Sequence, residues 1–120
     1  HFKKGMSVSN GRTWTCTEDT DIAVLPVGYA DGLLRRFSPG LKVAINKKEY
    51  PVVGRICMDQ CMVDIGKDNT DVHFWDKAVI FGPVENGEAT QDADTLAALG
   101  KTISYEVLTS VGKRVPRIEI

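Results

Sequence analysis

Short stretches in which apolar and polar residues alternate fill the first third of the chain. Residues 13–17 and 21–27 are rich in β-branched and aromatic side chains, and the polar residues between them predict a hairpin. Pro26 cannot donate a ladder hydrogen bond, so it indicates an edge or a bulge in the second strand. Residues 28–32 then predict a turn, and residues 33–37 predict one helical turn.

The same alternation continues through the middle of the chain. Residues 41–45 and 49–53 alternate on either side of a polar turn at 46–48, which predicts a second hairpin. Two further apolar stretches, 61–65 and 77–81, predict strands. The polar segment between them is rich in Asp and Asn, which favour turns, so we expect a long loop there.

The last third contains the clearest helical pattern. Thr90 is the predicted N-cap of a helix over residues 91–99, with Gly100 as its stop. Residues 102–108 predict a second short helix, and residues 115–120 predict a final strand. Many short strands with one or two short helices predict a mainly β fold, an antiparallel barrel or sandwich. Alternation alone does not choose between those two architectures.

Composition and charge narrow the classes of function. The 120 residues are 42% hydrophobic, which suits one domain with a modest core. A formal net charge of -1 gives no basic field for a nucleic-acid backbone or an acidic membrane, so we expect neither partner. No apolar stretch approaches the roughly 18 to 20 residues that cross a bilayer. Three cysteines, an odd number, fit a reducing cytoplasm, and the opening residues, which lack an initiator Met, suggest a fragment.

Motifs that would carry chemistry by themselves are weak. His1 and His73 lie in no cluster with metal-ligand spacing, so we expect no metal site. Cys57 and Cys61 would share one face of a strand and are better interpreted as small buried side chains. The chain contains no Ser-His-Asp signature, phosphate-binding loop or dinucleotide fingerprint. The residues alone therefore indicate a β-domain without assigning its function.

Five segments change this interpretation: VSNGRTW at 8–14, PVGYADG at 26–32, GRICMDQ at 54–60, ISYE at 103–106 and RVPR at 114–117. Together and in register, they resemble the C-terminal domain of alanine racemases from end to end. The resemblance implies that residues 1–120 form an antiparallel, Greek-key type, partly open β-barrel with one or two short helices. It also implies an N-terminal (β/α)8 barrel, carrying pyridoxal phosphate on a lysine, that lies outside this chain.

The resemblance implies an isomerase that interconverts L- and D-alanine and supplies D-alanine for cell-wall precursors. In the family two protomers pair head to tail, and the β-domain of one closes the barrel mouth of the other. Racemisation removes a proton from one face of the α-carbon and delivers one to the opposite face, while pyridoxal phosphate stabilises the carbanion. A lysine from one chain and a tyrosine from the other move these protons.

The catalytic tyrosine position is occupied by Asn10 in this sequence. A phenol titrates near pH ~10 and can be tuned downward, whereas a carboxamide does not exchange a proton usefully at neutral pH. Asn10 is thus a departure from the family pattern. It leaves three interpretations open: a working racemase domain, a noncatalytic relative, or an enzyme in which the tyrosine was deliberately replaced.

By resemblance, Tyr29 lies at the neck of the substrate entrance, the hydroxyl of Tyr105 reaches the cofactor phosphate, and the backbone N–H of Met58 binds the substrate carboxylate. The other residues that line or organise the entrance are Cys57, Asp59, Arg35, Arg55 and Ile103. The competing interpretations are tyrosines that pack by their rings, a core methionine, and surface arginines paired with Asp. We expect only a structural role for Arg117.

Alanine is the expected substrate, with serine as the close alternative, because such preferences depend on small pocket differences of about 1 to 3 kcal/mol. We expect a homodimer in the full-length protein and no activity from the domain alone. Surface that meets the barrel in such a protein would be exposed in this chain, so we also expect self-association.

Overall fold

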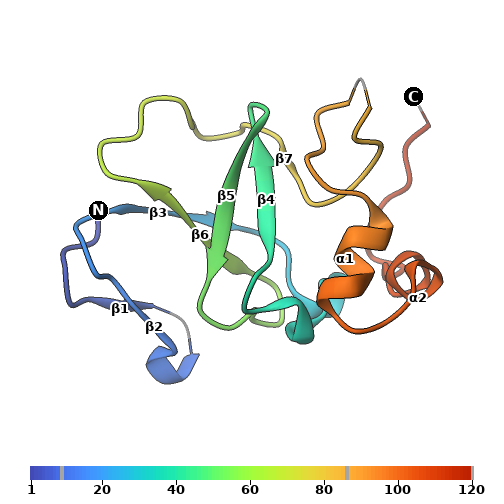
Figure 1. Ribbon diagram of the computed structural model, residues 1–120, viewed down its shortest axis with the longest axis horizontal. Helices are drawn as coiled ribbons and strands as arrows, with labels where there is room; N and C mark the ends of the chain where they lie inside the picture. The colour runs from blue at the N-terminus through green and yellow to red at the C-terminus, as the bar shows by residue number, and fades with distance from the viewer. Residues whose placement is uncertain (9, 86, 120) are drawn as a thin grey trace.

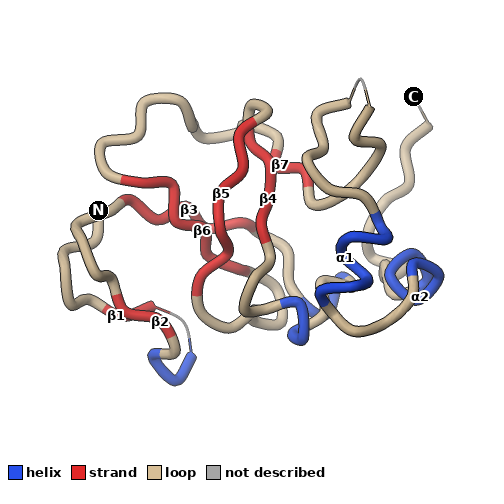
Figure 2. The backbone as a smooth tube through the Cα atoms, in the orientation of Figure 1, coloured by secondary structure: helices blue, strands red, loops and turns tan. Residues whose placement is uncertain are grey.

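The computed structural model describes residues 1–8, 10–85 and 87–119, and within them the fold is mainly antiparallel β-structure with short helices (Figures 1 and 2). The side chain of Asn10 lies outside the described part. The strands are β1 Ser7–Val8, β2 Trp14–Thr15, β3 Asp21–Leu25, β4 Lys42–Ile45, β5 Lys48–Val53, β6 Cys61–Gly66 and β7 Ala78–Val79. The α-helices are α1 Ala93–Leu99 and α2 Ser104–Thr109, and three 3-10 turns are η1 Asn10–Arg12, η2 Tyr29–Asp31 and η3 Arg35–Phe37.

The main sheet has the strand order β3-β6-β5-β4-β7, and each neighbouring pair is antiparallel. β4, β5 and β6 follow one another as a meander, and β3 returns beside β6, which is Greek-key connectivity. The sheet is open and curled, because β3 and β6 run across the view of Figure 1 while β4 and β5 run up it. The expected Greek-key, partly open antiparallel architecture is therefore confirmed.

One hydrophobic core joins the curled sheet to the helices. Alternation places Val43, Ile45 and Val63 of β4 and β6 on its inner side. Phe37 and Leu41 enter from the connection between β3 and β4, and the helices contribute further apolar side chains, among them Leu96 and Val107. Burial at about 25 cal/mol per Å² of apolar area makes this cluster the main stabilising contribution. The core therefore holds the β3–β4 connection, which carries η2 and η3, against the sheet.

The first predicted hairpin is wrong. β2 pairs with β1 through Val8 and Trp14, whereas β3 pairs with β6, where Ala23 lies opposite Val63. β6 offers β3 a partner strand with buried apolar side chains, and the polar residues after β2 turn the chain away from a direct return. β3 is an edge strand that ends at Leu25, before Pro26, as expected.

The hairpin predicted over residues 41–53 is confirmed as β4 and β5. Its turn residues, Asn46 and Lys47, both adopt positive φ (53° and 66°), as a two-residue hairpin turn of the I′ type requires. The strands predicted over 61–65 and 77–81 are present as β6 and the shorter β7.

The helices are where the sequence predicts them, but the first cap is different. The Asp92 carboxylate accepts hydrogen bonds from the Thr95 N–H at 2.8 Å and hydroxyl at 2.9 Å, so Asp92, not Thr90, caps α1. Hydrogen bonds from the Thr95 N–H and hydroxyl are the main reason that the pKa of the Asp92 carboxyl lies below its usual range. The helical turn predicted at 33–37 is the 3-10 turn η3, and the second predicted helix is α2.

Two other predictions are wrong. Residues 115–119 form no strand: residues 116–119 are exposed, and the Arg117 side chain donates to the Val115 carbonyl; Ile120 lies outside the described residues. Cys57 lies in the loop before β6, so it does not share a strand face with Cys61.

Candidate functional site

Two of the sequence motifs touch backbone to backbone. In η2 the Tyr29 N–H donates to the Cys57 carbonyl at 3.0 Å, and the Ala30 N–H donates to the Met58 carbonyl at 2.9 Å. A Cβ on Gly28 would overlap the Cys57 carbonyl oxygen and lie 2.5 Å from the Met58 carbonyl carbon. Only glycine allows this approach. We call the pair formed by residues 28–32 and 54–60 the docked loops.

A buried carboxylate lies at the centre of the first docked loop. Asp31, whose side chain is 9% exposed, accepts a hydrogen bond from the Gly28 N–H at 3.0 Å through Oδ2. Its Oδ1 lies 2.7 Å from Nε of Arg114, and its backbone carbonyl accepts from the Gly112 N–H at 3.0 Å. A Cβ on Gly32 would overlap the Ser110 carbonyl oxygen. The segment after α2 is therefore a third partner of the docked loops.

Arg117 organises that third segment. Its Nη1 donates to the carbonyls of Gly112 at 2.7 Å and Val115 at 2.6 Å, and its Nη2 donates to the carbonyl of Val111 at 2.9 Å. A planar guanidinium with several donors is suited to hold several carbonyls at once. These contacts are the structural role that the sequence predicts for this residue.

The docked loops leave several of the predicted site residues exposed. Tyr29 is 43% exposed and Met58 is 54% exposed, so neither is a core side chain. The Arg35 guanidinium carbon lies 5.9 Å from the centroid of the Tyr29 ring, a cation–π arrangement. Asp59 is exposed and Cys57 is half-buried beside the Arg55 carbonyl. The interpretation of Met58 as an ordinary core methionine therefore does not fit the structure.

The backbone of Met58 is engaged on one side only. Its carbonyl accepts from Ala30, whereas among the residues that the structure describes its N–H donates to no other group. The Cys57 carbonyl of the same peptide group is held by Tyr29. The peptide is planar, so this bond also fixes the direction of the Met58 N–H. The loop thus presents one oriented, unpaired backbone donor.

The α2 residues of the prediction lie on a second exposed surface. Ile103 immediately precedes α2, and Tyr105 in its first turn is 74% exposed. Arg36 forms an ion pair with Glu106, so the turn that carries Arg35 is tied to the turn that carries Tyr105. The structure therefore links η3 to α2 without packing Tyr105 into the core.

The segment with the catalytic position is η1. Arg55 is exposed and lies beside this turn, because a Cβ on Gly11 would be 3.4 Å from its Nη1 atom. In Figure 1, η1 and α2 lie at opposite sides of the view. In the sequence, both docked loops come between these two elements. The predicted role of the Asn10 side chain falls outside the described part of the structure.

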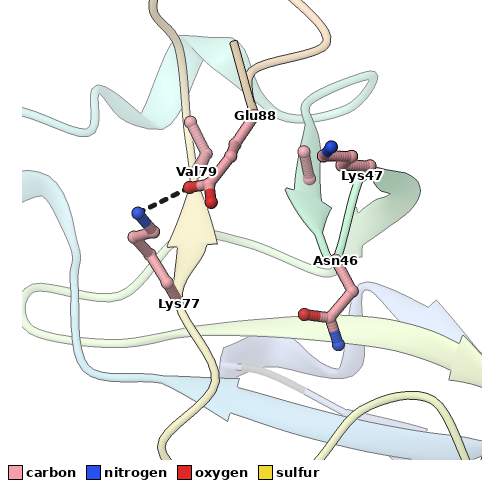
Figure 3. Close-up of a pocket in the computed structure, with 6 residues that line it drawn as sticks. Asn46, Lys47, Lys77, Val79 and Glu88 are labelled. Atoms are coloured by element: carbon pink, nitrogen blue, oxygen red, sulfur yellow. Dashed lines mark ion pairs between the residues drawn. The ribbon is translucent and has the colours of Figure 1, made fainter.

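Two hollows in the surface have none of the predicted site residues in their lining, although the second is lined by Arg36, Thr102 and Glu106, the sequence neighbours of Arg35, Ile103 and Tyr105. One, of about 290 Å³, is lined by residues of the β4–β5 turn and β7, and Figure 3 shows Lys77 extending toward Glu88 across it, with an N–O distance of 2.5 Å. The other, of about 610 Å³, lies between η3, the end of α1 and α2. Neither includes Tyr29, Met58 or Tyr105. The predicted residues instead occupy open surface, as one wall of a shared site would.

Cys61 starts β6 directly after the docked loops and is buried. Burial, with a smaller contribution from Cys57, raises the pKa of the Cys61 thiol to about 11. It therefore stays protonated at neutral pH and behaves as a small apolar side chain.

In the part of the chain that the structure describes, no group of three or more His, Cys, Asp or Glu side chains is arranged to hold a metal ion. No helix of the described residues is both long and apolar enough to span a bilayer.

Sequence reasoning did not single out Asp31 or Arg114 as interacting residues. The sequence signal that could have pointed to Asp31 is an acidic residue within the glycine-bounded segment 28–32, and the structure buries this residue. A charged residue buried in this way almost always has a partner. The partner is more than 80 positions away in sequence, so spacing could not identify it.

Comparisons with known proteins converge on one family. The family model described as "Alanine racemase, C-terminal domain" matches residues 1–119. The chain is 50% identical over 120 residues to an alanine racemase of Treponema denticola, covering 99% of this chain and 31% of that protein.

Solved structures give the same result. An alanine racemase from Streptomyces coelicolor A3(2) superposes with a TM-score of 0.89 and 39% identity, over 98% of this chain and 30% of that one. An alanine racemase from Bartonella henselae with covalently bound pyridoxal phosphate superposes with a TM-score of 0.88 and 30% identity, over 99% of this chain and 32% of that one. The chain thus spans about a third of the length of the proteins it matches.

Proposed function

Because this chain belongs to the alanine racemase C-terminal domain family, we propose that it forms one wall of a pyridoxal-phosphate-dependent active site that interconverts L- and D-alanine. The observation that carries the proposal is the backbone N–H of Met58, which is oriented by the docked loops and donates to no group among the described residues. Such a donor can bind the carboxylate that every amino-acid substrate carries. The rest of the site belongs to the cofactor-bearing barrel.

The side chains around Met58 form the substrate entrance in this proposal. Tyr29 narrows the entrance, and the guanidinium of Arg35 beside its ring attracts the substrate carboxylate. Arg55 adds a second cation on the side of η1. Asp59, Cys57 and Ile103 complete the wall, and their exposure or half-burial leaves them accessible to an opposing surface.

Tyr105 is the residue of this chain that would hold the cofactor. Its hydroxyl is on the first turn of α2 and its side chain is 74% exposed, so the phenol can donate to a phosphate oxygen. When bound, pyridoxal phosphate supplies an electron sink that stabilises negative charge at the substrate α-carbon. The Bartonella henselae enzyme carries pyridoxal phosphate covalently bound; in this proposal the lysine that would hold the cofactor is on the barrel.

Proton transfer at the second face of the α-carbon is the step that Asn10 affects. A carboxamide neither accepts nor donates a proton at a useful rate near neutral pH, whereas a phenol can do both. We therefore expect this chain to bind and orient alanine as the family does, with the proton transfer on its side impaired.

A fusion protein tests the proposal. This chain would replace the matching C-terminal segment of the Treponema denticola enzyme, both as it stands and as Asn10→Tyr. With pyridoxal phosphate, we expect the Asn10→Tyr fusion to racemise alanine, with exchange of the α-proton in deuterated water about 100-fold faster than with Asn10. Serine in the same assay should give a lower kcat/KM than alanine.

Three outcomes are informative. An Asn10→Tyr fusion that binds the cofactor, sediments as a dimer and does not racemise alanine would overturn the proposed function. Equal rates with Asn10 and Tyr would show that another group, such as Tyr29 or Tyr105, serves the second face. The chain alone, without a barrel, should be inactive with added cofactor, and racemisation by it would contradict the shared-site proposal.

A further inference from the structure

We infer that Asp31 is a positioning residue for substrate binding: clamped by Arg114, its buried carboxylate sets the direction of the Met58 N–H through the docked loops. Asp31 does not touch the proposed substrate; its effect reaches Met58 through two hydrogen-bonded steps, and Arg114 anchors it in a third contact on the opposite side. The inference rests on the proposed function for its consequence in catalysis, but the clamp itself can be tested without activity.

The first step is the bond from the Gly28 N–H to Oδ2 of Asp31, at 3.0 Å. The backbone of η2 closes over the same stretch, because the Asp31 N–H donates to the Gly28 carbonyl at 3.0 Å. A carboxylate that accepts a backbone N–H across three residues fixes the start of the turn. The conformation of Gly28, where no Cβ can be accommodated, is therefore held by Asp31.

The second step transmits this conformation to the other docked loop. With η2 fixed, the N–H groups of Tyr29 and Ala30 point at the carbonyls of Cys57 and Met58. The Cys57 carbonyl and the Met58 N–H belong to one planar peptide group and point in opposite directions. Fixing the carbonyl through Tyr29 fixes the N–H, and a hydrogen bond to the carbonyl also makes that N–H a stronger donor.

The third contact is the anchor on the opposite side of Asp31. Oδ1 lies 2.7 Å from Nε of Arg114, which is on the segment that Arg117 folds into a turn. The Gly112 N–H binds the Asp31 carbonyl as well. Because Asp31 is 9% exposed and Arg114 is 58% exposed, removing Arg114 would leave a carboxylate without its cation in a largely dry environment. Arg114 thus keeps the clamp in place from the far end of the chain.

The test separates the clamp from its effect on the reaction. In the chain itself, Asp31→Asn and Arg114→Gln should speed hydrogen exchange of the Tyr29 and Ala30 amides about tenfold or more, because a hydrogen bond to a charged group is lost. Glu88→Gln is the matched control, since it neutralises a carboxylate in the exposed pair with Lys77, far from these loops. Exchange at Tyr29 that is unchanged in both variants would overturn the inference.

The second readout is steady-state kinetics in the active Asn10→Tyr fusion. We expect Arg114→Gln to raise KM for alanine about tenfold while kcat stays within about threefold, because ground-state binding of the carboxylate is what weakens. Arg114→Lys, which restores the charge without the planar guanidinium, should recover part of the loss. A fall in kcat at unchanged KM, or a loss in proportion to unfolded protein, would overturn the positioning role.

The two proposals fail in distinguishable ways. If the fusion is inactive but the Tyr29 amide is deprotected by Arg114→Gln, the clamp stands and the proposed function does not. If Asp31→Asn does not fold, Arg114→Gln carries the test alone, because it leaves the Gly28 bond to Asp31 intact.

Discussion

The docked loops and the loop between β6 and β7 are built by opposite means. In the docked loops, backbone groups contact backbone groups directly, and Gly28 leaves no room for a single added carbon. The β6–β7 loop, residues 67–77, is instead held by side chains. Asn69 accepts from the N–H groups of Asp71 and Val72, both at 2.8 Å, and donates to the Ile65 carbonyl at 2.7 Å.

Further side-chain contacts brace the second loop against the β4–β5 turn. Lys48 binds Asp71 at 2.6 Å, and Asn46 donates to the Asp71 carbonyl at 2.7 Å and to the Asp76 carboxylate at 3.1 Å. At its tip, Phe74 is 97% exposed, and the equally exposed Trp75 adopts a φ of 74°. This loop therefore tolerates a left-handed backbone conformation at a bulky residue.

The difference shows how positional precision is obtained. A backbone-to-backbone contact has few adjustable torsions, so it fixes an N–H direction closely but fails on a small change. A loop held by side chains distributes its stability over several contacts, each of modest size. The proposed substrate contact lies in the first kind of structure, and the measurements below test whether the two loops differ as this argument requires.

The largest expected effect is the contrast between Gly28→Ala and Gly66→Ala. At Gly28 the new carbon meets two carbonyl groups of the other docked loop, so we expect a loss of about 3 kcal/mol or more in the free energy of unfolding. At Gly66, which has a φ of 83° and no neighbour within 4 Å, only backbone strain of about 1 kcal/mol applies. Urea denaturation measures both, and equal losses would remove the distinction.

The two regions should also differ in the pH range over which they lose stability, and the high-pH loss is expected from Cys61, directly after the docked loops. The pKa of Cys61 rises from 9.0 to about 11 on folding, mainly through burial. An unfolded thiol loses its proton from pH 9 upward while the folded one keeps it, so the stability present below pH 9 falls as pH rises toward 11. The expected extra loss is about 2 to 3 kcal/mol, absent in Cys61→Val. Denaturation curves of both proteins across this range measure it, and parallel curves would contradict it.

The loss of stability at low pH is expected from the β6–β7 loop. The hydrogen bond and charge of Lys48 lower the pKa of Asp71, and hydrogen bonds from His73 and Asn46 lower that of Asp76. Their contribution is present above the ordinary carboxyl pKa of 3.8 and is lost as pH falls through their lowered values. Asp71→Asn should reduce the loss of stability at low pH without changing the loss at high pH. NMR titration of the Asp71 and Asp76 carboxyl groups can follow the low-pH contribution.

A smaller effect is expected from Asn69→Ala. Four side-chain hydrogen bonds are lost, one of them a long contact of 3.5 Å with the Tyr50 hydroxyl, but the freed backbone groups are partly open to water, so we expect about 1 to 2 kcal/mol. Hydrogen exchange should quicken at Asp71 and Val72 while Tyr29 and Ala30 stay protected. Thr70→Ala, at an exposed neighbouring position, is the control. Simultaneous loss of protection in both loops would show that they are one cooperative unit.

The smallest expected effect is a gain. Trp75→Gly removes the cost of a left-handed conformation at a bulky residue whose ring makes little contact, and we expect about 0.5 to 1 kcal/mol of added stability. Phe74→Gly, at an equally exposed neighbour without left-handed φ, should give no gain. Thermal melts of the two variants decide this, and destabilisation by Trp75→Gly would indicate that the ring has a stabilising contact.

Local patterns in the sequence predicted the elements better than their partners. Alternation and turn residues located β4, β5, β6 and both helices, and Asn46-Lys47 marked the hairpin turn. The partner of β2 could not be predicted, because pairing with β1 rather than β3 depends on which surface β3 can bury against β6. The cap of α1 is Asp92 rather than Thr90 for a local reason, a competition between two capping residues two positions apart.

By itself, the sequence determined the family, the predominance of antiparallel strands and the two glycine-containing motifs, because these depend on residue identity and short-range periodicity. The tertiary structure alone decided that those motifs touch and that Tyr29 and Met58 remain exposed. It also decided that Asp31, within the first motif, is buried and paired with the distant Arg114. Burial and contact arise from segments far apart in sequence, and a linear pattern carries no information about the distance between them.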